Sequence, residues 1–132
     1  MAKLLLVASG ARLRGWALAA RDQYLARMPR GYVVDCVPRV PRGARIVALD
    51  ERGRDLSTAQ LAAQIGKWIG EPSPTAFVVG GPDGLEPQVK QEAALLLRLS
   101  SLTLPHALAQ VVLAEQLYRA ATLLTGHPYH RE

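Results

Sequence analysis

Residues 77–84 read Phe-Val-Val-Gly-Gly-Pro-Asp-Gly, an apolar strand that runs into a glycine-rich loop. Glycines let a backbone approach a ligand closely, and the ligands of parallel α/β sheets bind beyond the carboxyl ends of the strands. The loop has neither the Gly-Lys-Ser/Thr ending of a phosphate-binding loop nor Gly-x-Gly-x-x-Gly spacing. These residues alone leave two interpretations open, a ligand-binding loop and a plain turn.

Residues 100–106, Ser-Ser-Leu-Thr-Leu-Pro-His, predict a strand that ends in a rigid corner before the last helix. Backbone donors and acceptors at such a strand end could read the edge of a purine without charged side chains. Leu102 and Leu104 could then lie against the faces of the base. A core strand followed by a turn explains the same residues equally well.

The terminal segment 127–132, His-Pro-Tyr-His-Arg-Glu, places two imidazoles, a phenol and a guanidinium within five residues. A metal site is not favoured, because His106, His127 and His130 have no carboxylate or thiolate partner in view. Chain ends are normally polar and mobile, so a disordered end is one interpretation. The other is a segment for recognition and proton transfer.

The last predicted helix carries Glu115, Arg119 and Thr122 on one face of an otherwise apolar rod. A helix that is apolar on nearly every other side is buried, and a second subunit could provide the burial. In that case Arg119 lies near a composite site. A surface ion pair between Glu115 and Arg119, worth a few tenths of a kcal/mol, remains the alternative.

Short apolar runs alternate with longer amphipathic stretches, a pattern typical of a parallel sheet with right-handed crossovers. Several runs are almost continuously apolar, as in strands that are covered on both faces. Ser57 and Gln60 form a capping-box pattern, and Gly126 is a good helix terminator. The predicted strands are 3–8, 32–37, 45–49, 75–79 and 100–104, and the predicted helices are 15–28, 57–70, 86–97 and 107–125.

The link between the second and third strands breaks this rhythm. Residues 38–44, Pro-Arg-Val-Pro-Arg-Gly-Ala, are too few for a crossover helix, which needs about a dozen. The second strand must therefore pair antiparallel, lie at an edge, or reach its neighbour through a taut extended link. The fold class is α/β, a single-domain parallel sheet with helices on both faces, shortened at this link.

Composition supports one globular domain, since 132 residues with 49% hydrophobic and 20% charged residues are too apolar for disorder. The formal charge of +5 is uneven: residues 1–54 hold eleven basic and four acidic side chains, and residues 55–132 hold five and seven. Thirteen of the sixteen bases are arginine, whose planar guanidinium pairs with phosphate in two places. Nucleic-acid contact and a plain basic surface both remain open.

Cysteine usage and hydropathy exclude several classes of protein. A lone Cys36 excludes an internal disulfide framework and a cysteine-rich zinc site, and we expect a small buried side chain there. No apolar run approaches the roughly 18 residues that span a bilayer, and the stretch 4–8 is too short for a secretion signal. We expect a soluble, cytoplasmic protein that binds neither membrane nor metal.

Four motifs, in order along the chain, together resemble the ribosomal RNA large subunit methyltransferase H family of the SPOUT class. The resemblance covers essentially the whole chain, although Asp83 stands where the family more often has glutamate. The residues that carry it are Gly-Gly-Pro-Asp-Gly (80–84), Leu-Thr-Leu-Pro-His (102–106), Ala-Glu-Gln-Leu-Tyr-Arg-Ala (114–120) and His-Pro-Tyr-His-Arg-Glu (127–132).

The resemblance implies one SPOUT domain over residues 1–132, a homodimer, and a deep trefoil knot on the carboxyl side. It implies S-adenosylmethionine as methyl donor, 23S rRNA within the ribosome as partner, and N3 of a pseudouridine as the methylated atom. Carried over by position, the cofactor-binding residues are Leu49, Gly81, Ser100, Ser101, Leu102, Thr103, Leu104 and Pro105. The residues implied to act on the base are Arg119, Tyr129, His130 and Arg131, with Glu115 beside them.

Within the resemblance, His130 could accept the N3 proton and Arg131 could stabilise the resulting anion. Family members usually have a helix between the second and third strands, which residues 38–44 replace here. Arg39 and Arg42 in that link could strengthen contact with rRNA phosphates. A catalytically silent ribosome-binding protein and a related tRNA methyltransferase are the alternative functions.

Overall fold

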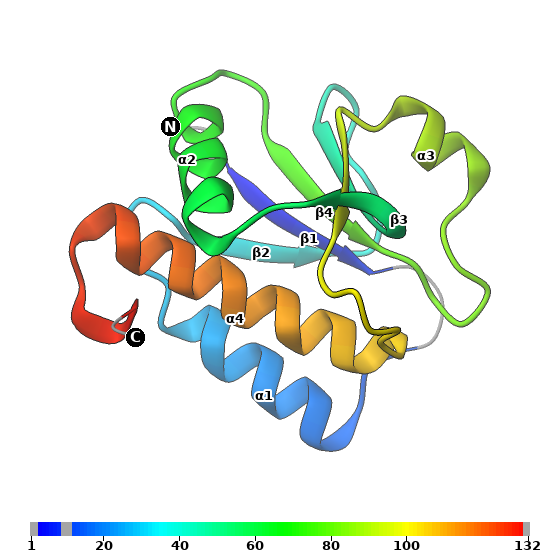
Figure 1. Ribbon diagram of the computed structural model, residues 1–132, viewed down its shortest axis with the longest axis horizontal. Helices are drawn as coiled ribbons and strands as arrows, with labels where there is room; N and C mark the ends of the chain where they lie inside the picture. Colours follow the sequence, from blue (N-terminus) through cyan, green and yellow to red (C-terminus); the bar gives the residue numbers. More distant parts are fainter. Residues whose placement is uncertain (1–2, 9–11, 131–132) are drawn as a thin grey trace.

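The computed structural model describes residues 3–8 and 12–130, including the backbone but not the side chain of His130. Five parallel strands form one sheet in the order β2-β1-β4-β3-β5, and helices flank it (Figure 1). The elements are β1 (Leu4–Ala8), α1 (Gly15–Ala26), β2 (Val34–Val37), β3 (Arg45–Asp55), α2 (Thr58–Ile69), β4 (Thr75–Val79), α3 (Pro87–Glu92), β5 (Leu95–Arg98), α4 (His106–Thr125) and a final turn η1 (Pro128–His130).

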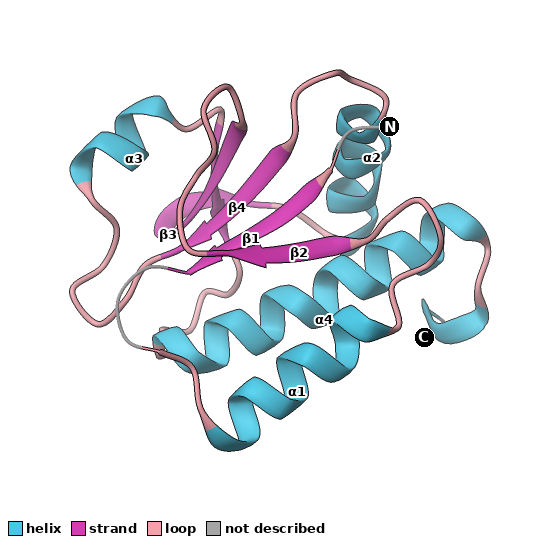
Figure 2. Cartoon of the chain, turned by 180° about the vertical axis from the view of Figure 1, so that it is seen from behind, coloured by secondary structure: helices cyan, strands magenta, loops and turns pink. Residues whose placement is uncertain are grey.

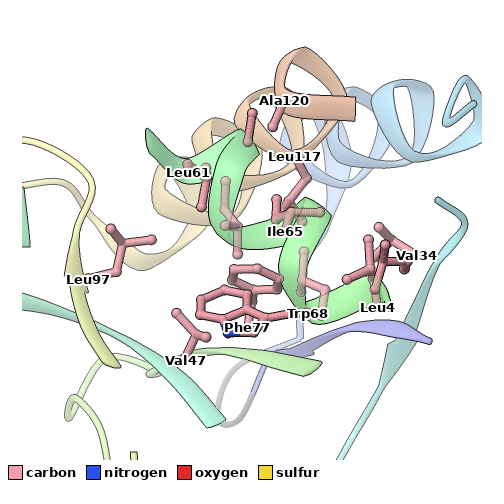
Figure 3. Packing of buried hydrophobic residues seen from close by; sticks show 14 of the residues in the cluster. Leu4, Val34, Val47, Leu61, Ile65, Trp68, Phe77, Leu97, Leu117 and Ala120 are labelled. Atoms are coloured by element: carbon pink, nitrogen blue, oxygen red, sulfur yellow. The ribbon is translucent and has the colours of Figure 1, made fainter. Parts of the chain in front are cut away.

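Successive strand residues point to opposite faces, so the nearly continuous apolar strands cover both sides of the sheet. One face contacts α1, α2 and α4, where Phe77, Ile65 and Leu117 are almost completely buried (Figure 3). The other face, formed by residues such as Leu5 and Val78, packs against Val89 of α3. The prediction of a parallel sheet with helices on both faces is therefore confirmed, with α3 on its own side (Figure 2).

The short link 38–44 lies on the same face as α3. Strands β1 and β4 separate β2 from β3, so the link crosses three strand spacings, about 14 Å, while returning to the amino end of the sheet. Eight steps of fully extended chain would reach about 26 to 29 Å, so the link is long enough to include a turn, in which the Ala44 N–H donates to the Pro41 carbonyl at 3.2 Å. Val40 and Ala44 pack against the sheet there. The link that connects β2 and β3 therefore covers the sheet with apolar residues, and the prediction that it is taut is wrong.

The hand of the crossovers explains which face each connection takes. The steps from β1 to β2 and from β3 to β4 run in one direction across the sheet, and the steps from β2 to β3 and from β4 to β5 run in the other. Right-handed crossovers in opposite directions lie on opposite faces. Helices α1 and α2 therefore share one face, and the link 38–44 shares the other with α3.

Strand β2 lies at an edge of the sheet and pairs parallel with β1, with Cys36 beside Leu6. Of the placements that the sequence allowed, the edge position is confirmed and antiparallel pairing is wrong. The expected burial of Cys36 is also wrong, since its side chain is exposed. An edge strand has a neighbour on one side only, which leaves its side chains less covered.

Two predicted elements near the carboxyl side of the chain are wrong. The predicted helix 86–97 ends at Glu92, and Leu95–Arg98 instead form β5, which pairs with β3. A run such as Ala-Ala-Leu-Leu-Leu suits a helix or a buried strand, and the free edge of β3 decides between them. Because β5 occupies that edge, residues 100–104 have no strand to join and form a loop.

The capping box at the start of α2 is confirmed. The Gln60 N–H donates to Ser57 Oγ at 3.1 Å, and the Ser57 N–H donates to Gln60 Oε1 at 2.9 Å. Two amide donors that the helix cannot satisfy internally are satisfied in this way. The cap fixes where the chain leaves β3 and begins to cross the sheet.

Removing the cap should cost stability. We expect Ser57→Ala to lower the free energy of unfolding by about 1 kcal/mol, because one amide at the start of α2 loses its acceptor. Urea unfolding followed by circular dichroism measures the change. Ser73→Ala, in the loop that follows α2, is the matched control and should change it by less than about 0.5 kcal/mol. Equal effects of the two substitutions would contradict the capping role.

The link 38–44 should contribute to stability through Val40. We expect Val40→Ala to lower the free energy of unfolding by about 1 kcal/mol, because two methyl groups leave a partly buried apolar site. Val33 is 61% exposed and provides the same substitution at an uncovered position. The same urea measurement should show almost no change for Val33→Ala, and a neutral Val40→Ala would mean that the link covers nothing.

Candidate functional site

A cavity of about 730 Å³ lies at the carboxyl ends of β3, β4 and β5. Parallel sheets place ligands at this edge, because the loops that leave several strands converge there. The glycine loop that follows β4 and the segment between β5 and α4 form much of its wall. The lining residues that the sequence had singled out are Leu49, Gly81, Ser100, Leu102, Thr103, Leu104 and Pro105.

The glycine loop is held in a tight turn over one side of the cavity. Gly81 and Gly84 form an isolated antiparallel bridge, in which the Gly84 N–H donates to the Gly81 carbonyl at 2.9 Å. Gly84 has a φ of +81°, and a Cβ on Gly80 would lie 2.6 Å from the carbonyl carbon of Gly84. Side chains at these positions would be strained or would collide, so the loop presents backbone to the cavity.

The segment from Leu99 to Pro105 forms another part of the wall. Its residues belong to no strand. Within the segment, the Leu102 N–H donates a hydrogen bond to Ser100 Oγ at 2.9 Å. Leu102 is 75% exposed, an unusual position for a large apolar side chain. Backbone groups outside a sheet ladder, beside an apolar side chain, suit a ligand with both polar edges and flat faces.

A third part of the wall comes from an irregularity in β3. The pairing of β3 with β5 shifts register between Leu49 and Arg54, and a Cβ on Gly53 would lie 2.6 Å from the carbonyl carbon of Leu96. The bulge turns Asp50 toward the cavity, where its Oδ1 accepts the Arg52 N–H at 2.7 Å. Its Oδ2 lies 3.0 Å from Lys90 Nζ. These two contacts hold the pKa of Asp50 below its ordinary value, and the hydrogen bond from the Arg52 amide has the larger effect.

A polar cluster extends from the middle of α4 into its carboxyl half. Glu115 Oε2 accepts hydrogen bonds from Arg119 Nε at 2.9 Å and from the Tyr129 hydroxyl at 2.8 Å. The Arg119 guanidinium lies 5.0 Å from the centre of the Tyr129 ring, which also packs edge-on against Tyr118. Burial, and then the Glu115 carboxylate, raise the pKa of Tyr129 well above its ordinary value. Tyr129 therefore stays protonated and acts as a donor.

The cavity and this cluster lie on different parts of the same helix. Ala109, which lines the cavity, and Arg119 are ten residues apart on α4, a rise of about 15 Å. His106 and Ala109 at its amino end line the cavity, whereas η1 packs at its carboxyl end (Figure 1). A rigid helix keeps the two groups of one chain apart.

The predicted site residues fall into these two places. Seven of the eight predicted cofactor residues line the cavity, and Ser101 lies outside the lining. Arg119 and Tyr129 contact each other at the carboxyl half of α4. The side chain of His130 and the whole of Arg131 lie outside the described residues.

Sequence reasoning missed Asp50 and Lys90 in the cavity wall. Asp50 directly follows the predicted strand 45–49, and this position was a usable signal for a site residue, although β3 itself continues to Asp55. Lys90 gives no such signal, because its contact with Asp50 depends on the packing of α3 against β3. His106 also lines the cavity, whereas the sequence analysis placed it in the corner before the last helix and gave it no contact with the cofactor.

The described residues 3–8 and 12–130 contain no group of three or more His, Cys, Asp or Glu side chains that could hold a metal ion. Within the same residues, no helix is both long and apolar enough to cross a membrane.

Comparisons with known proteins agree with the α/β fold. Residues 33–130 match a family model described as "Predicted SPOUT methyltransferase". A crystal structure of a probable methyltransferase from Bordetella pertussis Tohama I superimposes with a TM-score of 0.63 over 91% of this chain and 95% of that one. At 14% identity, that likeness shows the fold alone.

Curated relatives show the family. The chain is 44% identical to the ribosomal RNA large subunit methyltransferase H of Polynucleobacter asymbioticus, with 98% of this chain and 99% of the relative covered. It is also 44% identical to the protein of that name from Bordetella avium, with the same coverage. The chain belongs to the ribosomal RNA large subunit methyltransferase H family of SPOUT methyltransferases.

Proposed function

We propose that this chain methylates N3 of a pseudouridine in 23S rRNA of the large ribosomal subunit. The observation that carries the proposal is the cavity at the carboxyl ends of β3, β4 and β5, whose wall contains seven of the residues that the family resemblance assigned to the cofactor. The family uses S-adenosylmethionine, which supplies an activated methyl group when bound. The uneven arginine content supports an RNA substrate.

The residues of the cavity suit this cofactor. An adenosine needs polar backbone groups at its edge and apolar contact on its faces, which the segment 99–105 offers through backbone that belongs to no strand and through Leu102 and Leu104. Gly81 brings bare backbone close on the opposite side. Ser101 lies outside the lining, so we assign it no direct contact with the cofactor.

We also assign to the chain the homodimer and the deep knot of its family, in one domain over residues 1–132. The knot is supported by the two loops 80–85 and 99–106, which surround one cavity. The homodimer is supported by the separation along α4, because Arg119 of the polar cluster lies about 15 Å along the helix axis from Ala109 at the cavity of the same chain. A second copy, with its α4 antiparallel to the first, would place the cluster of each chain at the cavity of the other.

Exposed apolar side chains are consistent with that arrangement. Trp16 is 66% exposed at the start of α1, and Leu124 is 36% exposed near the end of α4. Helices α1 and α4 lie side by side, so these two residues mark opposite ends of one helical layer (Figure 1). A two-fold axis brings opposite ends of such a layer together, which would cover both side chains.

The chemistry requires a proton acceptor and a fixed geometry. Carbon leaves the sulfonium sulfur with the bonding electrons staying on sulfur, while the N3 lone pair forms the new bond in line. The imide N3–H must lose its proton, and we assign its acceptance to His130 and stabilisation of the anion to Arg131. Tyr129 is protonated and held by Glu115, so it orients the tail and does not act as the base.

The first test is the rRNA itself. Mass spectrometry of 23S rRNA from a strain that lacks this gene should show an unmethylated pseudouridine, and the gene should restore the methyl group. A double variant, His130→Ala with Arg131→Ala, should fail to restore it. Restoration of the methyl group by that variant would contradict the roles assigned to His130 and Arg131. Methylation of a tRNA instead of 23S rRNA would identify the alternative enzyme. No methylation at all would favour the silent ribosome-binding protein.

The second test concerns the cavity. We expect Gly80→Ala to weaken S-adenosylmethionine binding at least tenfold in calorimetry, because its Cβ would collide with backbone atoms of Gly84 and Leu85 and open the loop. Gly70→Ala, at the end of α2, is the matched control, since its Cβ would lie 3.6 Å from the nearest described atom. Unchanged binding by Gly80→Ala would move the cofactor site elsewhere.

The third test concerns the dimer. Gly80→Ala damages the cavity and Arg119→Ala damages the cluster, so each variant alone should be almost inactive. Co-expressed chains that assort at random give half mixed dimers, each with one intact site, and should recover about a quarter of the wild-type activity. A site built from a single chain would recover nothing, which makes the two arrangements distinguishable.

A further inference from the structure

An ion pair spans the wall of the cavity between β3 and α3. Asp50 Oδ2 lies 3.0 Å from Lys90 Nζ, and both residues line the cavity. The Asp50 side chain is only 8% exposed, whereas that of Lys90 is 47% exposed. The carboxylate is therefore a shielded charge at the cavity, and Lys90 is the cation that balances it.

The other charges of the lining act more weakly inside the cavity. Glu51, Arg52 and Asp83 are exposed, so water and salt screen them. Arg98 is held by a bidentate contact with Asp55 on the neighbouring strand. With three acidic and three basic side chains, the lining has no net formal charge. The Asp50–Lys90 pair is the best shielded part of that balance.

The charge balance matters because donor and product differ by one unit of charge. S-adenosylmethionine has a sulfonium cation, and the thioether left after methyl transfer is neutral at sulfur. We propose that the Asp50–Lys90 pair keeps the cavity from favouring either the charged donor or the uncharged product. This inference rests on the proposed function, since it concerns the cofactor of that reaction.

Each partner keeps the other from biasing the cavity. An Asp50 without Lys90 would attract the sulfonium and hold the donor more tightly than the transition state, in which the positive charge is already fading. A Lys90 without Asp50 would repel the donor and favour the product, which would then leave slowly. The pair also joins α3, the helix that follows the glycine loop, to β3, so both residues are positioning residues.

The test compares the affinities of S-adenosylmethionine and S-adenosylhomocysteine by calorimetry. We expect Lys90→Met to raise the donor-to-product affinity ratio about fivefold and Asp50→Asn to lower it about fivefold. A fivefold change corresponds to about 1 kcal/mol, which is within the range for two unit charges that solvent partly screens. The double variant should return to within about twofold of the wild-type ratio. All shifts should shrink as salt is raised.

The controls separate charge from structure. Lys90→Arg keeps the pair and should keep the ratio, and Lys67→Met removes the same charge from α2, outside the cavity lining, and should also keep it. If the pair had a purely structural role, both single variants would bind both ligands more weakly and the donor-to-product affinity ratio would not change. That result would overturn the inference. Failure of the wild-type protein to bind either ligand would instead overturn the proposed function.

Discussion

The length and stiffness of α4 constrain the rest of the molecule most strongly. Ala109 near its amino end lines the cavity, and Arg119, ten residues later, lies about 15 Å further along the helix axis. The carboxyl half of the same helix holds Tyr129 against Glu115 and Arg119. The helix therefore keeps the cavity and the polar cluster of one chain at a fixed separation.

Local signals predicted much of the fold because they are decided within a few residues. The cap at Ser57, the terminator at Gly126 and the apolar run of β4 each depend on neighbours along the chain, and all three are found. The segment from Glu86 to Leu104 depends instead on a distant partner. Residues 95–98 form a strand because β3 has a free edge with which they can pair. No pattern within the segment itself indicates that this edge is available.

The candidate site divides in the same way. The glycine loop and the segment 100–105 were found from their composition, although the second was predicted as a strand and is a loop. That error is instructive, because a strand would have used the backbone groups that the loop leaves available at the cavity. Asp50 and Lys90 were missed because their contact joins two elements that are 40 positions apart in the sequence.

The link between β2 and β3 has a consequence for the economy of the chain. Seven residues join the two strands, and two of them are Pro38 and Pro41. Proline narrows the range of conformations open to the unfolded chain, so less entropy is lost when the link becomes ordered. A short connection can therefore cover part of the sheet at a small entropic cost.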